Sequence, residues 1–300
     1  MDGVLLLDKP AGMTSHDCVN RVRRILKTKK VGHTGTLDPN VTGVLPICVG
    51  RATKISQFLT ASVKEYIGEV TLGFSTTTED ADGEVVATKK VERQLTTAEV
   101  LQVLRAMIGT QIQVPPMYSA VKVKGKKLYE YARAGLEVQR PQREVTIYEL
   151  EMLSDLLEVS PGMIKFSFRV KGSKGLFVRT VAVTIGEALG YPAHMSDLRR
   201  IASGTFEISN CVTFEKLEEQ IQMNQLDLLS IEEALKDYPK IYVDSWVEKL
   251  VRNGVGLNPD QVGEQTGAHP FAIYSASGSC LAVYEKHPTK AGYRSLRGLV

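Results

Sequence analysis

The chain of 300 residues has few cysteines and no long apolar run. Its four cysteines are scattered without a Cys-x-x-Cys pair, and its five histidines form no local motif. This argues against a disulfide framework and predicts that there is no metal site. No stretch approaches the roughly 18 consecutive apolar residues of a membrane-spanning helix, and the N-terminus does not resemble a signal peptide. We therefore expect a cytoplasmic protein without a membrane anchor.

An excess of one charge is also missing, because 37 Lys and Arg residues face 34 Asp and Glu residues and leave a net charge of +3. The distribution of charge is more informative. Residues 21–30 hold six cations and no acid, and residues 122–143 hold seven cations and two acids. Such patches can follow a phosphate backbone, although two solvated faces on a nearly neutral protein explain them equally well.

Hydrophobic periodicity predicts strands at residues 3–7, 66–72, 84–87 and 164–170. Cap signals predict helices after Thr14 or Ser15, after Thr96 with Ile108 on the buried face, near Val178, and in the acidic stretch 213–235. Residues 31–43, rich in Gly, Thr, Asp and Pro, are expected to form a loop. Strands separated by helices without a regular βαβ repeat indicate an α+β fold with a mixed, largely antiparallel sheet flanked by helices.

The pair Tyr238-Pro239 is interpreted as a domain boundary. Residues 1–238 would form the main domain and residues 239–300, with short β-rich runs among glycines, a small β-rich C-terminal domain. The basic stretch would be an insertion at about residues 118–145 of the main domain. With few apolar residues to anchor it, this insertion is expected to be mobile without a ligand.

Asp38 lies in the glycine-rich loop and directly precedes Pro39. The fixed φ of a proline holds a neighbouring carboxylate close to the backbone, which suits a catalytic acid. An Asp-Pro pair is also a common way to open a turn, and Asp often caps a helix. Taken alone, the residues favour the turn.

The string GHTGTLDP at residues 32–39, followed by TGVL at residues 42–45, resembles the catalytic loop of the tRNA pseudouridine synthase B family. Five further motifs match that family in the same order: residues 9–15 (KPAGMTS), 64–66 (KEY), 115–122 (PPMYSAVK), 172–180 (GSKGLFVRT) and 198–204 (LRRIASG). Two positions depart from the family's pattern. Phe177 replaces a common tyrosine, and Thr76-Thr77 replaces a Thr-Asp pair, while the turn Asp80-Ala81-Asp82-Gly83 is intact. The resemblance covers about residues 1–210.

This resemblance implies an isomerase that converts the T-loop uridine at position 55 of tRNA to pseudouridine. The glycosidic bond is broken and remade through carbon without a redox change, so no cofactor or metal is expected. The implied partner is the T arm of tRNA. No protein partner is expected, the chain would be a monomer, and the C-terminal domain would be a PUA-like RNA-binding module.

The resemblance also implies roles for individual residues. Asp38 would be the nucleophile, attacking either C1′ of the sugar or the base. Tyr66 and Phe177 would stack on the flipped uracil, and Tyr66 could accept the C5 proton. Arg179 would orient Asp38, which would explain a cation at a helix start, where the macrodipole disfavours it. The other expected substrate-binding residues are His33, Lys9, Leu198, Lys122, Lys124, Lys126 and Lys127.

Two alternatives remain open. The guide-RNA-dependent relatives of this family share the catalytic loop and work with protein partners. An RNA-binding or RNA-folding protein with vestigial catalytic residues would also retain the basic segments.

Overall fold

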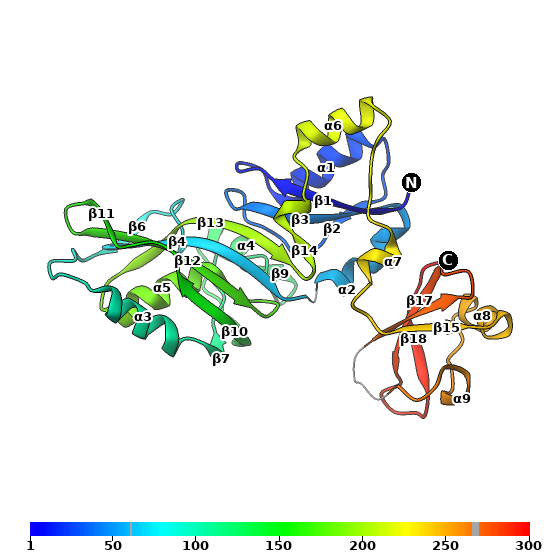
Figure 1. Cartoon of the computed structure of the whole chain (residues 1–300). Coiled ribbons are helices and arrows are strands. Elements are labelled where there is room, and N and C mark those ends of the chain that lie inside the picture. The colour runs from blue at the N-terminus through cyan, green and yellow to red at the C-terminus, as the bar shows by residue number, and fades with distance from the viewer. Residues whose placement is uncertain (61, 266–269) are drawn as a thin grey trace. The chain divides into compact units, whose positions relative to one another are not determined.

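The computed structural model describes residues 1–60, 62–265 and 270–300 (Figure 1). Contacts divide the chain into two compact units. Unit 1 comprises residues 1–39, 45–61 and 210–300, and unit 2 comprises residues 40–44 and 62–209. His269, one of the five histidines considered for a metal motif, lies outside the described residues.

Unit 2 is built on an antiparallel sheet with one parallel neighbour. Its strands run in the order β13 (Ala193–Ser203), β4 (Lys64–Leu72), β12 (Met163–Gly172), β10 (Arg143–Met152) and β7 (Gly109–Gln113). Each of these neighbours is antiparallel. The first residues of β3 (Thr42–Val49) pair parallel to β13, with Thr42 opposite Arg199. The predicted mixed, largely antiparallel sheet is therefore confirmed.

Helices α3 (Thr97–Ala106) and α5 (Val178–Leu189) pack on β10 and β13 respectively. In β12 the aromatic rings of Phe166 and Phe168 are buried, while the charged side chains alternate with them on the opposite face, as the periodicity predicted. Helix α5 ends at Gly190, whose φ of +85° is the left-handed conformation that closes many helices.

The expected burial of Ile108 is wrong. Thr96 and Glu99 form the predicted capping box, but α3 ends at Ala106 with Met107 as its C-cap. Ile108 therefore lies beyond the helix and is 45% exposed.

Shorter elements complete unit 2. They are the hairpin β5 (Phe74–Thr76) and β6 (Val85–Thr88), the edge strands β11 (Leu157–Ser160) and β14 (Phe206–Glu207), the 3₁₀ helix η2 (Ile208–Asn210, whose last residue lies in unit 1), and, in the insertion, β8 (Lys122–Val123), β9 (Lys126–Lys127) and α4 (Leu128–Arg133).

Unit 1 begins with β1 (Gly3–Lys9) and α1 (Ser15–Ile25), capped by Thr14 and Asp17. Strand β1 lies beside β3, and β2 (Val31–His33) pairs with the end of β3. The expectation that residues 31–43 form only a loop is therefore wrong at residues 31–33, in β2, and at residues 42–43, in β3. The 3₁₀ helix η1 (Gly50–Ile55) and α2 (Ser56–Thr60) follow.

The acidic stretch 213–235 forms two short helices, α6 (Phe214–Gln222) and α7 (Ile231–Ala234). The chain turns just after α6 at Asn224, whose φ is +55°. A single helix across this stretch is therefore not formed.

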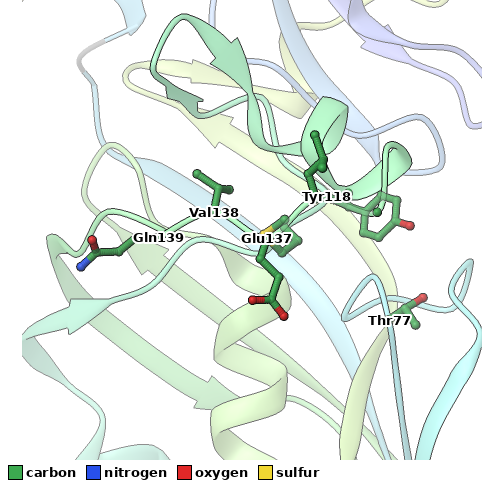
Figure 2. A pocket seen from close by; sticks show the side chains of 9 residues that line it. Thr77, Tyr118, Glu137, Val138 and Gln139 are labelled. Atoms are coloured by element: carbon green, nitrogen blue, oxygen red, sulfur yellow. The ribbon is translucent and has the colours of Figure 1, made fainter.

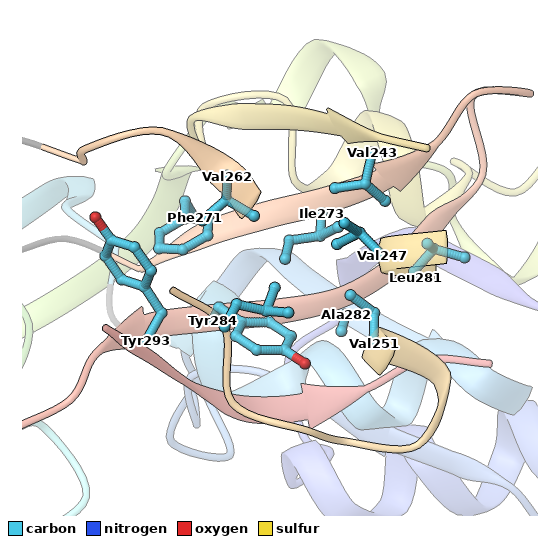
Figure 3. Packing of buried hydrophobic residues seen from close by; sticks show 11 residues of the cluster. Val243, Val247, Val251, Val262, Phe271, Ile273, Leu281, Ala282, Tyr284 and Tyr293 are labelled. Carbon is cyan, nitrogen blue, oxygen red and sulfur yellow. The ribbon is translucent and has the colours of Figure 1, made fainter. Parts of the chain in front are cut away.

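The C-terminal part of unit 1 has its own four-stranded sheet in the order β15 (Lys240–Val243), β16 (Phe271–Ser275), β17 (Cys280–Lys286) and β18 (Tyr293–Gly298). Helices α8 (Ser245–Arg252) and α9 (Pro259–Val262) accompany it. Figure 3 shows the apolar cluster of this region, which includes Val247, Phe271 and Tyr284. The predicted β-rich C-terminal region is confirmed, and the boundary at residue 238 stays a prediction.

Candidate active site

Asp38 lies in the loop between β2 and β3, and side chains fix the backbone on both sides of it. The hydroxyl of Ser15 donates a hydrogen bond to the carbonyl of Leu37 (3.0 Å) and accepts one from its N–H (2.9 Å). On the other side, Nζ of Lys9 donates to the carbonyls of Pro39 (2.7 Å) and Pro10 (2.8 Å). Asp38 itself is half-buried, so the loop presents a carboxylate on a backbone with little freedom.

Lys9 is fully buried, with no exposed surface. A buried ammonium requires polar partners, and the two carbonyls provide them. This placement suits a residue that positions the loop, and the expected contact of Lys9 with substrate stays a prediction. His33 pairs with Ile47 at the end of β2 and is half-buried, and its role also stays a prediction.

The residues that follow Asp38 are anchored within unit 2. The amide of Asn40 donates to both carboxylate oxygens of Asp82 (2.8 and 2.7 Å). At Gly43, φ is +103° and a Cβ atom would collide with the backbone of Arg200. Nε of Arg200 donates to the carbonyl of Val44 (2.7 Å) from a side chain that is 1% exposed. Only glycine allows this close approach of β3 to β13.

Arg179, in the first turn of α5, is 4% exposed and joins α5 to two other segments of unit 2. Its Nη1 donates to the carbonyl of Thr78 (2.7 Å) and lies 3.3 Å from a carboxylate oxygen of Asp80. Its Nη2 donates to the carbonyl of Tyr118 (2.7 Å). Arg179 is therefore not a surface cation, although it lies at the start of a helix. The expected contact between Arg179 and Asp38 stays a prediction.

Phe177 is held by a residue that the sequence did not single out. The side-chain amide of Gln113 accepts a hydrogen bond from the N–H of Phe177 (2.8 Å) and donates one to its carbonyl (3.0 Å). Gln113 ends β7 and is 8% exposed. Because Phe177 is the N-cap of α5, this double hydrogen bond fixes the backbone two residues before Arg179. The position of Gln113 just before the PPMYSAVK motif was the only signal available in the sequence.

Tyr66 and Leu198 lie on adjacent strands of the sheet. Tyr66 is opposite Arg200, and Gly68, two residues further along β4, is opposite Leu198. A Cβ atom on Gly68 would press on the ring of Phe168 and the side chain of Leu198. Since residues two apart share a face, Tyr66 and Leu198 lie on the same face of the sheet. Tyr66 is half-buried and Leu198 is buried.

Lys64 and Glu79 are among the ionisable groups of unit 2 whose pKa values are shifted. Burial lowers the pKa of Lys64, which shares the face of Tyr66, to about 8. Burial also raises the pKa of Glu79, whose carboxylate accepts a hydrogen bond from the hydroxyl of Thr180 (2.8 Å). Both shifts follow from the cost of charge in a dry environment. In the residues that the structure describes, no group of three His, Cys, Asp or Glu side chains could hold a metal ion.

Apolar side chains anchor one end of the insertion, where Leu128 is fully buried and Val121, just before the basic stretch, is 7% exposed. The expected mobility of the insertion without a ligand stays a prediction. Lys122, Lys124 and Lys126 are exposed, and Lys124 has a φ of +49° at the turn between β8 and β9. Nζ of Lys127 lies 3.3 Å from the hydroxyl of Tyr129. The predicted phosphate contacts of these four lysines remain untested.

A pocket of about 710 Å³ lies between the insertion and the turn of residues 76–83 (Figure 2). Its walls include Thr77, Tyr118, Glu137, Val138 and Gln139, and none of the described residues that line it is a lysine or arginine. Tyr118 is the residue whose carbonyl Arg179 binds, so the pocket adjoins the segment that Arg179 holds.

Comparisons with known proteins identify the class of enzyme. A family model described as "TruB family pseudouridylate synthase (N terminal domain)" matches residues 23–178. A second, described as "tRNA pseudouridylate synthase B C-terminal domain", matches residues 179–238. The chain is also similar to a crystal structure of a Cbf5-Nop10-Gar1 complex, with a TM-score of 0.75 and 26% identity over 99% of this chain and 85% of that chain. The class is that of the pseudouridylate synthases.

Within that class, the chain belongs to the TruB family. It is 56% identical to the tRNA pseudouridine synthase B of Bacillus cytotoxicus, over 97% of this chain and 95% of that relative. It is 55% identical to the tRNA pseudouridine synthase B of Geobacillus thermodenitrificans, over 97% of both chains. Among residues 1–60, 62–265 and 270–300, no helix has the length and apolar character needed to cross a bilayer.

Proposed function

We propose that this chain isomerises the uridine at position 55, in the T loop of tRNA, to pseudouridine, with Asp38 as the nucleophile. The observation that carries the proposal is the double fixation of the Asp38 loop. Ser15 holds the residue before Asp38 and the buried Lys9 holds the residue after it. A reacting group on a preorganised backbone does not have to be ordered at the moment of reaction.

The bonds and protons of uridine and pseudouridine balance, so the isomerisation needs no co-reactant. The bond from C1′ to N1 breaks, the base rotates, and a bond from C1′ to C5 forms. C5 then loses a proton and N1 gains one. Asp38 can attack C1′ or the base, and the products of both routes are the same.

Tyr66 and Phe177 are proposed to stack on the extruded uracil, a contact worth ~1–3 kcal/mol per base. Phe177 lacks a hydroxyl, so Tyr66 is the aromatic residue that can accept the C5 proton. Arg179 is proposed to orient Asp38. Its burial supports this role, because a buried guanidinium keeps a fixed geometry that a surface cation lacks.

The insertion is proposed to bind the phosphates of the T arm through Lys122, Lys124, Lys126 and Lys127. Changing Lys124, Lys126 and Lys127 to Ala should weaken T-arm binding and lower the salt slope by up to ~3 units if each contacts a phosphate. The C-terminal region is proposed to be a PUA-like module that adds contacts with whole tRNA.

The chain is proposed to act alone, although the solved structure that it resembles is a complex of three named proteins. Its 97% coverage of a relative named tRNA pseudouridine synthase B favours the stand-alone enzyme over a guide-dependent one. The purified chain should therefore convert an isolated T-arm hairpin with no other component. A requirement for a second RNA or a protein would contradict this.

Asp38→Asn tests the nucleophile, because the amide keeps the shape of the side chain and removes its charge. We expect no release of tritium from uridine labelled at C5, with affinity for the T-arm hairpin within a few-fold of the parent. Asp155→Asn, at an exposed aspartate outside the site, is the matched control and should react like the parent. Turnover by Asp38→Asn would refute the assignment. Binding of the hairpin by the parent without any isomerisation would point to a protein that only binds or folds RNA.

A further inference from the structure

The basic segment of residues 21–30 contains cations of two kinds. Arg21 forms an ion pair with Glu218 (3.0 Å) and lies over the ring of Phe214, 4.2 Å from its centroid. Arg23 donates to the carbonyl of Val31 (3.0 Å) and to the side chain of Asn20 (3.1 Å). These two arginines hold α1 against its neighbours in unit 1, so they are accounted for by the fold.

The remaining four cations, Arg24, Lys27, Lys29 and Lys30, form what we call the α1-end patch. All four are exposed. Within the part of the chain that the structure describes, no carboxylate forms an ion pair with any of them. A group of like charges without counter-charges repels itself, so the fold alone does not explain why they are gathered here.

The turn that carries the patch is fixed by backbone hydrogen bonds. The N–H of Thr28 donates to the carbonyl of Arg23 (3.2 Å), and that of Val31 to the carbonyl of Lys29 (3.0 Å). The N–H of Gly50 donates to the carbonyl of Lys30 (2.8 Å). The patch is thus held on ordered backbone immediately before β2, which leads to the Asp38 loop.

Lys27 occupies a backbone conformation that normally favours glycine. Its φ is +50° at the end of α1, where a left-handed residue closes the helix. This conformation is unfavourable for an L-residue, because its Cβ atom crowds the following carbonyl oxygen. The turn therefore keeps a cation at a position where glycine would be less strained, and Lys124 does the same in the insertion.

Stabilisation of the helix end is the competing explanation. The macrodipole stabilises cations near a helix C-terminus, and this effect accounts for Arg24 and Lys27. Lys29 and Lys30 lie beyond the last turn, where this effect has faded. The helix dipole therefore explains the positions of two of the four cations, and those of Lys29 and Lys30 need another explanation.

We propose that the α1-end patch binds phosphates of the helical stems of tRNA, in addition to the contacts proposed for the insertion. This rests on the proposed function, which supplies the polyanion. The patch offers charge but no exposed apolar side chain, since Ile25 and Leu26 are half-buried. That chemistry fits a sugar-phosphate backbone better than a protein partner or a membrane, both of which reward apolar contact.

The test is the salt dependence of binding by a variant with all four cations changed to Gln (R24Q, K27Q, K29Q, K30Q). If each side chain neutralises one phosphate, the slope of log affinity against log salt should fall by up to ~3.6 units on whole tRNA. The matched control changes four exposed cations elsewhere, K90Q, R105Q, K216Q and K236Q, and so removes the same charge. It should leave the slope near that of the parent.

Comparison of whole tRNA with the T-arm hairpin shows which stem the α1-end patch contacts. A slope lowered on whole tRNA but not on the T-arm hairpin would place the patch on another stem, and a slope lowered on both would place it on the T arm. An unchanged slope on whole tRNA, or an equal fall in the control, would overturn the proposal. Because α1 could be weakened by four changes, the pair K29Q and K30Q, outside the helix, repeats the test with about half the effect. Isomerisation by the parent is measured separately, so failure of the proposed function would be recognised by itself.

Discussion

The Asp38 loop in unit 1 and the Arg179 region in unit 2 are both organised by a buried cation, but in different ways. In unit 1 the ammonium of Lys9 binds carbonyls beside the residue proposed to react. In unit 2 the guanidinium of Arg179 gathers the carbonyls of Thr78 and Tyr118 and is itself proposed to assist the reaction. In unit 1 one residue, Lys9, positions the loop and another, Asp38, is proposed to react. In unit 2 the single side chain of Arg179 is proposed to do both.

This difference predicts how rate and stability respond to substitution. A change at Arg179 should affect both, because it removes architecture and chemistry together. A change at Lys9 should affect mainly the rate, because burial of an ammonium already carries a cost that an apolar side chain avoids.

Arg179→Lys should have the largest effect among these changes. Lysine keeps the charge but replaces a planar, two-pronged donor with a single flexible ammonium. It cannot reach both carbonyls in the same way, and an unsatisfied buried carbonyl costs about 1–3 kcal/mol. We expect kcat to fall at least about ten-fold, which corresponds to ~1.4 kcal/mol of transition-state stabilisation, with little change in RNA affinity.

Single-turnover rates and urea unfolding measure the two effects of Arg179→Lys together. Arg169→Lys, at a half-exposed arginine of β12 on the face opposite to the buried Phe168, is the control for the chemical change itself. A normal kcat for Arg179→Lys would remove Arg179 from the catalytic set.

Lys9→Met should separate rate from stability. Methionine has a similar length but cannot donate to the carbonyls of Pro10 and Pro39, so the Asp38 loop should lose its fixed position. Misplacement of a reacting group can cost up to ~10²-fold, and we expect a fall in kcat of about ten-fold. The free energy of unfolding should change less than in Arg179→Lys, because the variant also removes a buried charge. Should stability fall and kcat stay normal, Lys9 would be purely structural; Lys236→Met, at an exposed lysine, is the control.

Local signals were sufficient to predict the elements that depend on neighbouring residues. The capping box at Thr96, the left-handed Gly190 and the alternation in β12 are all fixed by residues a few positions apart. Strand β2 was missed because three residues carry no periodicity, and it forms only by pairing with β3. The missed break at Asn224 reflects a backbone conformation that asparagine tolerates but does not require.

In the candidate site, too, features that depend on local sequence were predicted and features that depend on distant partners were missed. The family motifs identified Asp38, Tyr66 and Arg179 as candidates, but not what holds them. The roles of Lys9 and Gln113 depend on partners 30 and 64 positions away in the chain. A buried lysine or glutamine looks like any other polar residue until those distant carbonyls are placed beside it.

Gln113→Met should have an intermediate effect and tests whether the order of α5 matters beyond Arg179 itself. Methionine matches the size of glutamine and removes both hydrogen bonds to Phe177. We expect kcat to fall about three- to ten-fold, roughly 0.6–1.4 kcal/mol, with a smaller change in KM.

Coupling distinguishes positioning by Gln113 from general destabilisation. If Gln113 acts through α5, the double variant with Arg179→Lys should show less than the sum of the two losses in rate. Additive losses in rate, or a loss of stability with normal kcat, would show that Gln113 only supports the fold.

The smallest effect on kcat is expected from removal of the C-terminal region, which contains neither Asp38 nor Arg179. A chain ending at Tyr238 keeps the hydrogen bond from its hydroxyl to the carbonyl of Phe58 (3.2 Å) and loses the one from the N–H of Cys280 to the carboxylate of Glu232 (2.8 Å). The removed residues contain their own apolar cluster, so the rest should still fold. We expect KM for whole tRNA to rise and kcat to stay near that of the full chain, the pattern of lost uniform binding. KM for the T-arm hairpin should rise less, because the hairpin lacks the surface that a PUA-like module would contact.

Thermal unfolding monitored by circular dichroism checks the fold of the shortened chain. If it is unfolded, residues 239–300 belong to the core of unit 1 and the boundary lies elsewhere. An equal rise in KM on both substrates would instead place the C-terminal contacts on the T arm.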